Sequence, residues 1–294
     1  MRLSITNNAV YGVRTGSNAA YLPLLGIEAC GKAGFDRMEY NFCAGSAAGK
    51  PLANDNWQDV VSDLKQALDA NGIAIPYTHD FWYLMAKATD TADIAHKDLM
   101  IRRGFEASKM LGSQLMVIHT QSIFDEDGYN PEKTYIYNKV LLAEMGELAA
   151  RFGLSLAIEN VFPIPGAIGH GCYPEEMAEL MTELNDPLFG ICWDLGHANM
   201  AQVEHEKALE IIAPWLRHVH VNDNKAKNDD HAIPGYGTVP WDTVMQKLKA
   251  IGYQGDLTLT TRTFNQTSLP HRWALDLEYL RNVGNDLIRM FEEA

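Results

Sequence analysis

The feature of this sequence that most constrains its fold is a regular alternation of short apolar runs with longer amphipathic segments. The short runs have the length and composition of β-strands, and they cover residues 3–6, 37–41, 73–78, 115–118, 154–159, 189–193, 218–221 and 257–260. The longer segments have the apolar spacing of helices, and they cover residues 21–32, 57–71, 94–111, 132–152, 174–184, 205–212, 241–251 and 274–291. This alternation predicts a parallel sheet with helices packed outside it.

Eight such units in a chain of 294 residues fit a single (β/α)₈ TIM barrel, a fold that uses about 250 residues plus insertions. We expect the extra length to lie in insertions in the loops after the strands, on the face where such barrels carry their active sites. No linker rich in proline, glycine or serine divides the chain, so we expect one domain over residues 1–294. An open doubly wound sheet is the alternative fold, but no glycine-rich phosphate loop follows the first strand.

Several helix ends are marked in the sequence. Asn130 precedes Pro131, which predicts a capping residue followed by the first helical position. Gly72, Gly153 and Gly252 each follow a helical segment, where glycine readily adopts the left-handed conformation that ends a helix.

The charge of the chain limits the partners that it can bind. It has 38 acidic and 24 basic residues, which give a formal net charge of −14. Binding to duplex DNA or to an anionic membrane comes mostly from Lys and Arg on phosphates, so we expect neither partner. The cysteines form no CxxC pair, the first residues do not resemble a signal peptide, and no apolar run reaches the roughly 20 residues of a membrane span. We therefore expect a cytoplasmic protein.

Titratable side chains gather at the carboxyl ends of the expected strands. His79, His119, Glu159 and Asp194 each stand where a strand ends, and the ends of barrel strands meet at one face. The set is completed by His197, His218, His220, Asp229 and His231. Each of these residues taken alone fits an ordinary structural role. Their convergence on one end of one barrel favours a functional site.

Alternation within the strands directs some of these side chains into the barrel. Glu159 shares the small-residue face of its strand with Ser155 and Ala157, and His218 and His220 share the inward face of theirs. Buried carboxylates and imidazoles in one pocket are costly unless a cation binds them, so we expect a metal site. Oxygen and nitrogen donors rich in carboxylate favour Mn²⁺ or Mg²⁺, and the histidines also allow Zn²⁺ or Co²⁺.

Three segments carry a family resemblance. IENVFPIPG, ICWDLGHANM and HVHVNDNK, the last with the later DDHAIPGYGTVPWDTV, resemble segments of the xylose-isomerase-like TIM-barrel superfamily. That superfamily includes sugar isomerases, ketose 3-epimerases, inosose dehydratases and endonuclease IV. The resemblance implies that Glu159, Asp194 and His220 are three of the four metal ligands of the single-metal sugar enzymes. The fourth ligand of those enzymes is a glutamate on the eighth strand, where this chain has Thr260.

The chain also resembles the trinuclear site of endonuclease IV. The matching ligand positions are His79, His119, Glu159, Asp194, His197, His220, Asp229 and His231. The strand-eight glutamate is missing from this pattern too. The acidic charge of the chain argues against a DNA-repair role.

The resemblance implies a divalent-metal-dependent isomerase or epimerase that acts on a small polyhydroxy carbonyl compound through an enediolate. In that interpretation Glu159 is the general base beside the metal, and His197 and Arg262 contact substrate hydroxyls. The further candidates for substrate binding or an additional metal are His79, His119, Asp229 and His231. We expect a small sugar-like substrate and a homo-oligomer, as is common among relatives.

Two other functions remain open from the sequence. One is a metal-dependent hydrolase or lyase of a small substrate, with the site architecture of endonuclease IV. The other is a catalytically weak sugar-binding protein, which the absence of the strand-eight glutamate favours.

Overall fold

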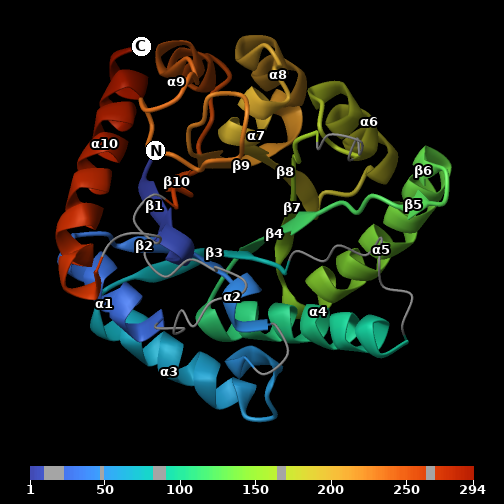
Figure 1. Ribbon diagram of the computed structural model, residues 1–294, viewed down its shortest axis with the longest axis horizontal. Helices are drawn as coiled ribbons and strands as arrows, with labels where there is room; N and C mark the ends of the chain where they lie inside the picture. The colour runs from blue at the N-terminus through green and yellow to red at the C-terminus, as the bar shows by residue number, and fades with distance from the viewer. Residues whose placement is uncertain (10–22, 47–49, 82–90, 164–169, 263–268) are drawn as a thin grey trace.

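The protein is described by a computed structural model over residues 1–9, 23–46, 50–81, 91–163, 170–262 and 269–294. Its centre is a closed barrel of parallel strands in the order β1-β10-β9-β8-β7-β4-β3-β2, which Figure 1 shows from one end. The strands are β1 (Leu3–Thr6), β2 (Arg37–Asn41), β3 (Ala74–His79), β4 (Leu115–His119), β7 (Ser155–Glu159), β8 (Phe189–Asp194), β9 (Leu216–Val221) and β10 (Leu257–Leu259). The sheet closes because β1 pairs in parallel with both β2 and β10. The predicted (β/α)₈ barrel is therefore confirmed.

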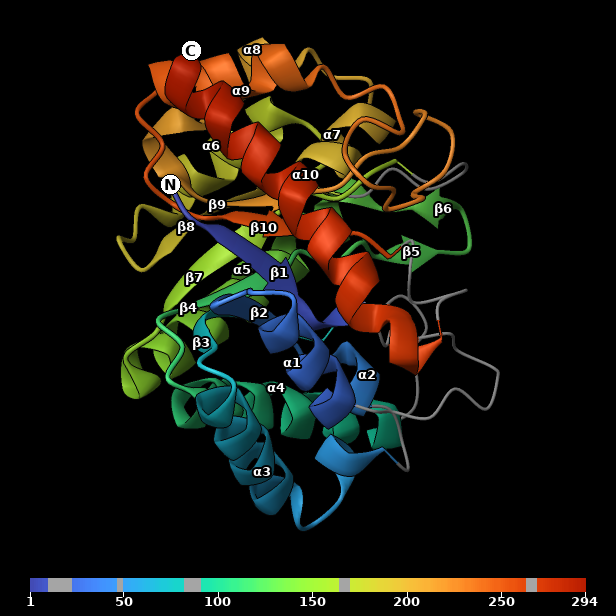
Figure 2. The same ribbon diagram turned by 90° about the vertical axis from the view of Figure 1, so that its left-hand side faces the viewer.

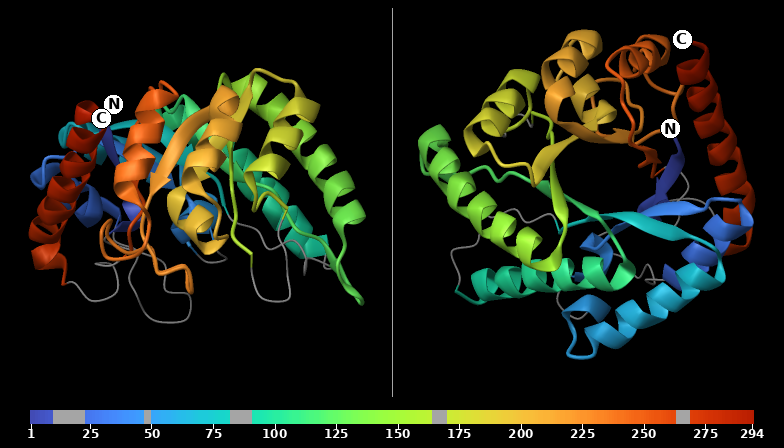
Figure 3. Two further views of the ribbon diagram at one scale, coloured as in Figure 1. Left: turned by 90° about the horizontal axis from the view of Figure 1, so that it is seen from above. Right: turned by 180° about the vertical axis from the view of Figure 1, so that it is seen from behind.

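Helices form a ring outside the strands, as the end-on view in Figure 3 shows. The long helices are α1 (Pro23–Lys32), α3 (Trp57–Ala70), α4 (Thr91–Leu111), α5 (Pro131–Phe152), α6 (Pro174–Leu184), α8 (His205–Ile212), α9 (Trp241–Ala250) and α10 (Trp273–Glu293). Figure 2 shows α10 lying across the outside of β1, near both chain termini. None of the helices among the described residues is long and apolar enough to cross a membrane.

The connections contain short elements that were not expected from the sequence. A hairpin of β5 (Phe124–Asp125) and β6 (Gly128–Tyr129) follows β4, and two short helices, α2 (Cys43–Ser46) and α7 (Leu195–Met200), follow β2 and β8. Each lies in a connection after a barrel strand. The expected helix ends are present: the Asn130 side chain accepts a hydrogen bond from the Lys133 amide at 2.9 Å, and Gly153 ends α5 with φ of 68°.

The core has two parts, as the alternation within the strands predicts. The large part lies between strands and helices and includes Met38, Ile158 and Val219. The small part lies inside the barrel and consists of Leu115, Val117, Ala157 and Cys192, with Tyr77 packed against it. Because these residues alternate along their strands with those of the outer part, Glu159 falls on the inward face, two residues after Ala157. The barrel interior therefore contains an apolar cluster of these residues, and the side chains at the carboxyl ends of its strands are polar.

Candidate active site

The titratable residues expected at the strand ends do meet in one place. His79, His119, Glu159 and Asp194 are the last residues of β3, β4, β7 and β8. All four are buried, and so is His220 near the end of β9. A cavity of about 330 Å³ lies over them and is lined by Thr6, Asn8, Glu39, Asn41, Cys43, His79, His119, Glu159, His197, His220, Asp229, His231, Thr260 and Arg262.

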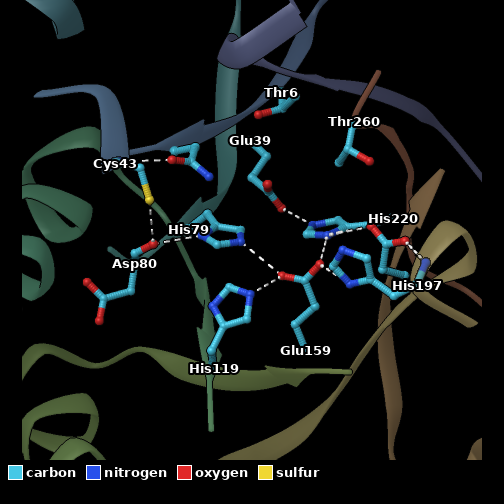
Figure 4. Close-up of polar contacts among 12 residues, drawn as sticks. Thr6, Glu39, Cys43, His79, Asp80, His119, Glu159, His197, His220 and Thr260 are labelled. Carbon is cyan, nitrogen blue, oxygen red and sulfur yellow. Dashed lines mark hydrogen bonds and ion pairs between the residues drawn. The ribbon is translucent and has the colours of Figure 1, made fainter. Parts of the chain in front are cut away.

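Glu159 is at the centre of this group, as Figure 4 shows. Its Oε2 atom lies 3.0 Å from Nε2 of His79 and 2.8 Å from Nε2 of His119. Its Oε1 atom lies 2.9 Å from Nδ1 of His220 and 3.6 Å from Nδ1 of His197. Both carboxylate oxygens therefore face imidazoles, which come from β3, β4, β9 and the helix α7.

The electrostatics of the site follow from this crowding. Burial alone would raise the pKa of Glu159, but the charges and hydrogen bonds of His220 and His119 hold it well below its usual range. Burial lowers the pKa of His119, whereas at His79 the hydrogen bond and charge of Glu159 outweigh burial and raise the pKa. Glu159 therefore favours the ionised form inside the barrel, where the imidazoles that contact it offset the cost of its burial.

Asp194 joins this centre to the start of α7. Its Oδ1 atom accepts a hydrogen bond from the backbone amide of His197 at 2.8 Å, which caps the helix. Its Oδ2 atom lies 3.8 Å from Nδ1 of His220. The His197 ring is oriented by its Nδ1–H, which donates to the carbonyl oxygen of Asn160 at 2.8 Å. The Asp-x-x-His spacing therefore places His197 in the cavity lining, while Asp194 is fully buried next to His197 and His220.

A second group lies beside His197. Its Nε2 atom is 3.8 Å from Oδ1 of Asp229, and Oδ2 of Asp229 is 3.1 Å from Nε2 of His231. Burial opposes the ionised form of Asp229, but His231 and His197 hold its pKa below the usual range. His231 has a φ of 44°, in the left-handed region that is uncommon for a non-glycine residue. Its Nδ1–H donates to the backbone oxygen of Thr260 at 2.7 Å, which holds the ring in place.

Thr260 lies where the eighth strand meets the cavity. Its Oγ1 atom accepts a hydrogen bond from Nδ2 of Asn222 at 3.0 Å, and the same amide donates to Oδ2 of Asp194 at 2.8 Å. Oδ1 of Asn222 is buried and has no hydrogen-bond partner among the described residues. Gly196 permits this packing, because a Cβ atom there would lie 1.9 Å from that oxygen. Arg262 is exposed at the cavity rim, and its backbone amide donates a hydrogen bond to the backbone oxygen of His231 at 2.9 Å.

The donor set fits a divalent cation. Among the described residues, four groups each bring three donor atoms within 4.8 Å of one another. They are His79 with His119 and Glu159; Glu159 with Asp194 and His197; His197 with Asp229 and His231; and Cys192 with His218 and His220. Buried carboxylate and imidazole donors that converge in this way, beside an unpartnered amide oxygen, suit Mn²⁺, Mg²⁺, Zn²⁺ or Co²⁺.

Reasoning from the sequence missed the buried polar residues of the cavity lining on the first two strands and their ends, which are Thr6, Asn8, Glu39 and Asn41, and the buried Asn222 and Asp223 after β9. Glu39 alternates with Met38 and Tyr40 on β2, so its inward direction could have been read from the strand pattern. Asn222 and Asp223 follow the two histidines of β9, but the sequence alone does not indicate which groups they contact.

A larger groove, of about 750 Å³, lies outside the barrel between α5 and α6. Its lining includes Tyr135, Leu142, Leu180 and Phe189. It contains none of the metal-donor groups found in the described part of the chain. The smaller cavity at the strand ends is therefore the candidate active site.

A closed eight-stranded barrel with convergent carboxylates and imidazoles at the carboxyl ends of its strands is typical of metal-binding TIM-barrel proteins. The chain belongs to the xylose isomerase-like TIM barrel family, whose model matches residues 27–283.

Individual relatives and solved structures have low sequence identity to this chain. An uncharacterized protein of Methanocaldococcus jannaschii is 31% identical over 171 residues, which are 55% of this chain and 55% of that protein. An inosose dehydratase of Geobacillus thermodenitrificans is 24% identical over 242 residues, which are 74% of this chain and 79% of the enzyme. The crystal structure of a D-tagatose 3-epimerase-like protein superposes with a TM-score of 0.75 at 21% identity, covering 100% of this chain and 99% of the other. At that identity the structural match speaks for the fold alone.

Proposed function

We propose that this protein is a divalent-metal-dependent enzyme that moves a proton at the carbon next to a carbonyl group in a small polyhydroxy compound. The central position of Glu159 carries the proposal, because its carboxylate lies among the imidazoles of His79, His119 and His220 in the cavity at the strand ends. The relatives support a sugar-type substrate, since they include inosose dehydratases and the fold neighbours include ketose epimerases. Isomerisation, epimerisation and elimination of water are the reactions of this class that such a substrate allows.

The metal would be held by Glu159, Asp194 and His220, and Mn²⁺ or Mg²⁺ is the cation that we expect. When bound, a divalent cation supplies positive charge that favours the enediolate form of a hydroxycarbonyl substrate. Glu159 would accept the proton from the carbon. His197 would donate a hydrogen bond to a substrate hydroxyl, and Arg262 would contact the part of the substrate nearest the cavity rim.

The presence of Thr260, where the family resemblance implies a glutamate, favours some reactions of this class over others. Epimerisation at C3 uses one base on each face of the carbon, and the hydroxyl of Thr260 is not a base near neutral pH. We therefore propose aldose–ketose isomerisation or elimination of water, in which Glu159 alone handles the proton, rather than two-base epimerisation.

A second function, a hydrolase or lyase that binds more than one cation, is favoured by one observation. His197, Asp229 and His231 form a donor group that shares no residue with the group of His79, His119 and Glu159. Metal analysis of the purified protein separates the two proposals, because the first needs one cation for each chain and the second needs two or more.

The proposed reaction is tested by deuterium incorporation. The protein, stripped of metal and reloaded with Mn²⁺, Mg²⁺, Co²⁺ or Zn²⁺, is incubated in D₂O with a panel of ketoses, aldoses and inososes. We expect one substrate to gain deuterium next to its carbonyl group and to yield an isomerised or dehydrated product by NMR and mass spectrometry.

Two variants control this experiment. Glu159→Gln keeps the volume of the side chain but removes the base, and we expect no deuterium incorporation above the buffer rate. Asp230→Asn lies in the same loop as Asp229 and should leave incorporation unchanged. If no metal and no substrate on the panel gives exchange, the proposed reaction is wrong. Cleavage of phosphate esters or other small esters without exchange would support the hydrolase instead.

A further inference from the structure

Glu39 is a buried carboxylate that the proposed reaction does not use. It lies on β2 with no exposed surface. Its Oε2 atom accepts hydrogen bonds from Nε2–H of His220 at 2.8 Å and from Nε2–H of His218 at 2.9 Å. Its Oε1 atom has no hydrogen-bond partner among the described residues. A carboxylate in this position is costly to bury, so the two imidazoles that it contacts are the groups that compensate it.

His220 connects Glu39 to the centre of the site, as Figure 4 shows. While Nε2 of His220 faces Glu39, Nδ1 of the same ring lies 2.9 Å from Oε1 of Glu159 and 3.8 Å from Oδ2 of Asp194. The hydrogen bond at one ring nitrogen therefore determines that the other nitrogen points to the two candidate carboxylate ligands. Rotating the ring away would break the contact with Glu39 as well.

His218 is the second donor to the same oxygen of Glu39. It is fully buried, its ring lies 4.1 Å from the ring of Tyr77 between centroids, and it meets the ring of His220 edge-on at 5.2 Å. Neither ring can turn freely in this packing. The two hydrogen bonds from these imidazoles therefore hold the carboxylate of Glu39 in place.

We propose that Glu39 is a positioning residue for His220: it binds Nε2–H and so presents Nδ1 of His220 to the divalent cation. The inference rests on the metal site of the proposed function. Histidines that bind metals generally donate their other ring N–H to a carboxylate, carbonyl or water, and loss of that partner weakens metal binding by about 10- to 100-fold. Glu39 also places a negative charge next to His220, in a site where Thr260 has replaced an anionic ligand.

The proposal is tested by measuring binding of Zn²⁺ and Mn²⁺ to metal-stripped protein by calorimetry. Glu39→Leu removes the acceptor and the charge, and we expect it to weaken binding by about 10- to 100-fold. Glu39→Gln keeps the size and one acceptor oxygen but loses the charge, and we expect an intermediate loss. The matched control is Thr258→Val, because Thr258 is buried in the barrel, pairs with His220 in register and has a hydroxyl without a hydrogen-bond partner among the described residues. It should bind metal as the wild type does.

A second measurement does not depend on metal. In ¹⁵N-labelled protein we expect the Nε2–H proton of His220 to exchange slowly with water, and we expect this protection to be lost in Glu39→Leu. If the wild type binds no divalent metal, the proposed function fails. The exchange rate of this proton then tests whether Glu39 orients His220: slow exchange that is lost in Glu39→Leu supports it, and equal exchange in both proteins contradicts it.

Unchanged metal affinity in a folded Glu39→Leu variant would overturn the proposal. If that variant does not fold, Glu39→Gln decides: affinity equal to that of Thr258→Val would overturn the proposal, and weaker affinity would support it. A role of Glu39 in folding alone would lower the midpoint of thermal unfolding without changing either the metal affinity of the folded protein or the exchange of the His220 proton.

Discussion

Thr260 occupies the position where the family resemblance implies a glutamate, and its hydroxyl changes what the site can hold. It accepts a hydrogen bond from Asn222, whose amide also donates to Asp194. The family resemblance implies a negative charge at this position, where the protein has this neutral contact in a cavity lined by the carboxylates of Glu39, Glu159 and Asp229. A hydroxyl is a poorer ligand than a carboxylate for a hard divalent cation, so we expect the native site to bind metal more weakly than a site with the glutamate.

The variant Thr260→Glu tests that account. We expect it to tighten Mn²⁺ binding by about 10-fold or more, because affinity in oxygen-ligand sites rises with the number of charged ligands. Thr260→Gln is the control of equal size without the charge. The measurement is a calorimetric titration of each metal-stripped protein. A glutamate variant that binds Mn²⁺ no better than the glutamine variant would refute the account, as would efficient C3 epimerisation by the native protein.

We expect His205 to make the unfolding free energy of the protein depend on pH. It is the first residue of α8, it is buried, and neither ring nitrogen has a hydrogen-bond partner among the described residues. Burial lowers its pKa to about 4, against an effect of Asp223 in the opposite direction. The unfolded chain, with a pKa of about 6.5, therefore binds a proton that the folded protein excludes as the pH falls from about 6.5 to 4.

We expect this residue to cost the native protein about 2 kcal/mol of unfolding free energy at pH 5 relative to pH 7.5. The variant His205→Leu should lose this part of the pH dependence, whatever its stability at pH 7.5. Urea unfolding of both proteins at the two pH values gives the comparison. An equal change with pH in the two proteins would show that His205 does not titrate in this way.

At the scale of elements, the loop after β9 is organised by one side chain. Oδ1 of Asp223 accepts backbone hydrogen bonds from Asn224 at 2.9 Å and Val239 at 3.1 Å. Its Oδ2 atom accepts from the Gly235 amide at 2.8 Å and from Nε1 of Trp241 at 3.0 Å. Asp223 therefore connects the two ends of the loop that contains Asp229 and His231. Through Trp241 it also connects the start of helix α9 to the end of β9.

We expect Asp223→Ala to lower the unfolding free energy by about 3 kcal/mol or more, because it leaves several buried donors without an acceptor. Amide hydrogen exchange across residues 224–239 should also accelerate. Asp230→Ala is the control, since it removes a carboxylate from the same loop but no side-chain hydrogen bond of the described structure. Urea unfolding and exchange mass spectrometry measure the two effects. Equal stability of the two variants would exclude the organising role of Asp223.

At the scale of the whole molecule, the net charge of −14 bears on the resemblance to endonuclease IV. Eight donor positions of that resemblance are present and the strand-eight glutamate is absent. A protein that binds duplex DNA, however, gains most of its affinity from Lys and Arg on phosphates. The cavity has Arg262 at its rim and three carboxylates, those of Glu39, Glu159 and Asp229, in its lining. We therefore expect small substrates and not a nucleic acid.

This expectation is tested with a fluorescent duplex that contains an abasic site. We predict no cleavage with Mg²⁺, Mn²⁺ or Zn²⁺ and no binding tighter than about 10⁻⁵ M at physiological salt, which is in the non-specific range. Efficient incision at the abasic site would reverse the order of the two proposed functions.

The barrel and most of its site could be predicted from the sequence because the relevant signals are local. The alternation of apolar runs, the capping at Asn130 and the inward direction of Glu159 all follow from spacing along one element. The aromatic run Phe81-Trp82-Tyr83 fits either a cover over a ligand or a packed loop. Phe81 is buried in the core, and the other two residues lie outside the described ones. The roles of the site residues, the metal, the cytoplasmic location and the oligomeric state stay predictions.

The residues at strand ends, and the face of the strand on which each side chain lies, follow from periods of two and 3.6 residues along the chain. The contacts between these side chains, in contrast, depend on the folded barrel. Glu39 meets His218 and His220 across separations of 179 and 181 residues, and His79 meets Glu159 across 80. Such pairs depend on the register and closure of the barrel, where β1 joins β10. The spacing of residues along the chain does not predict this closure, because the barrel closes only when all eight strands pair with one another.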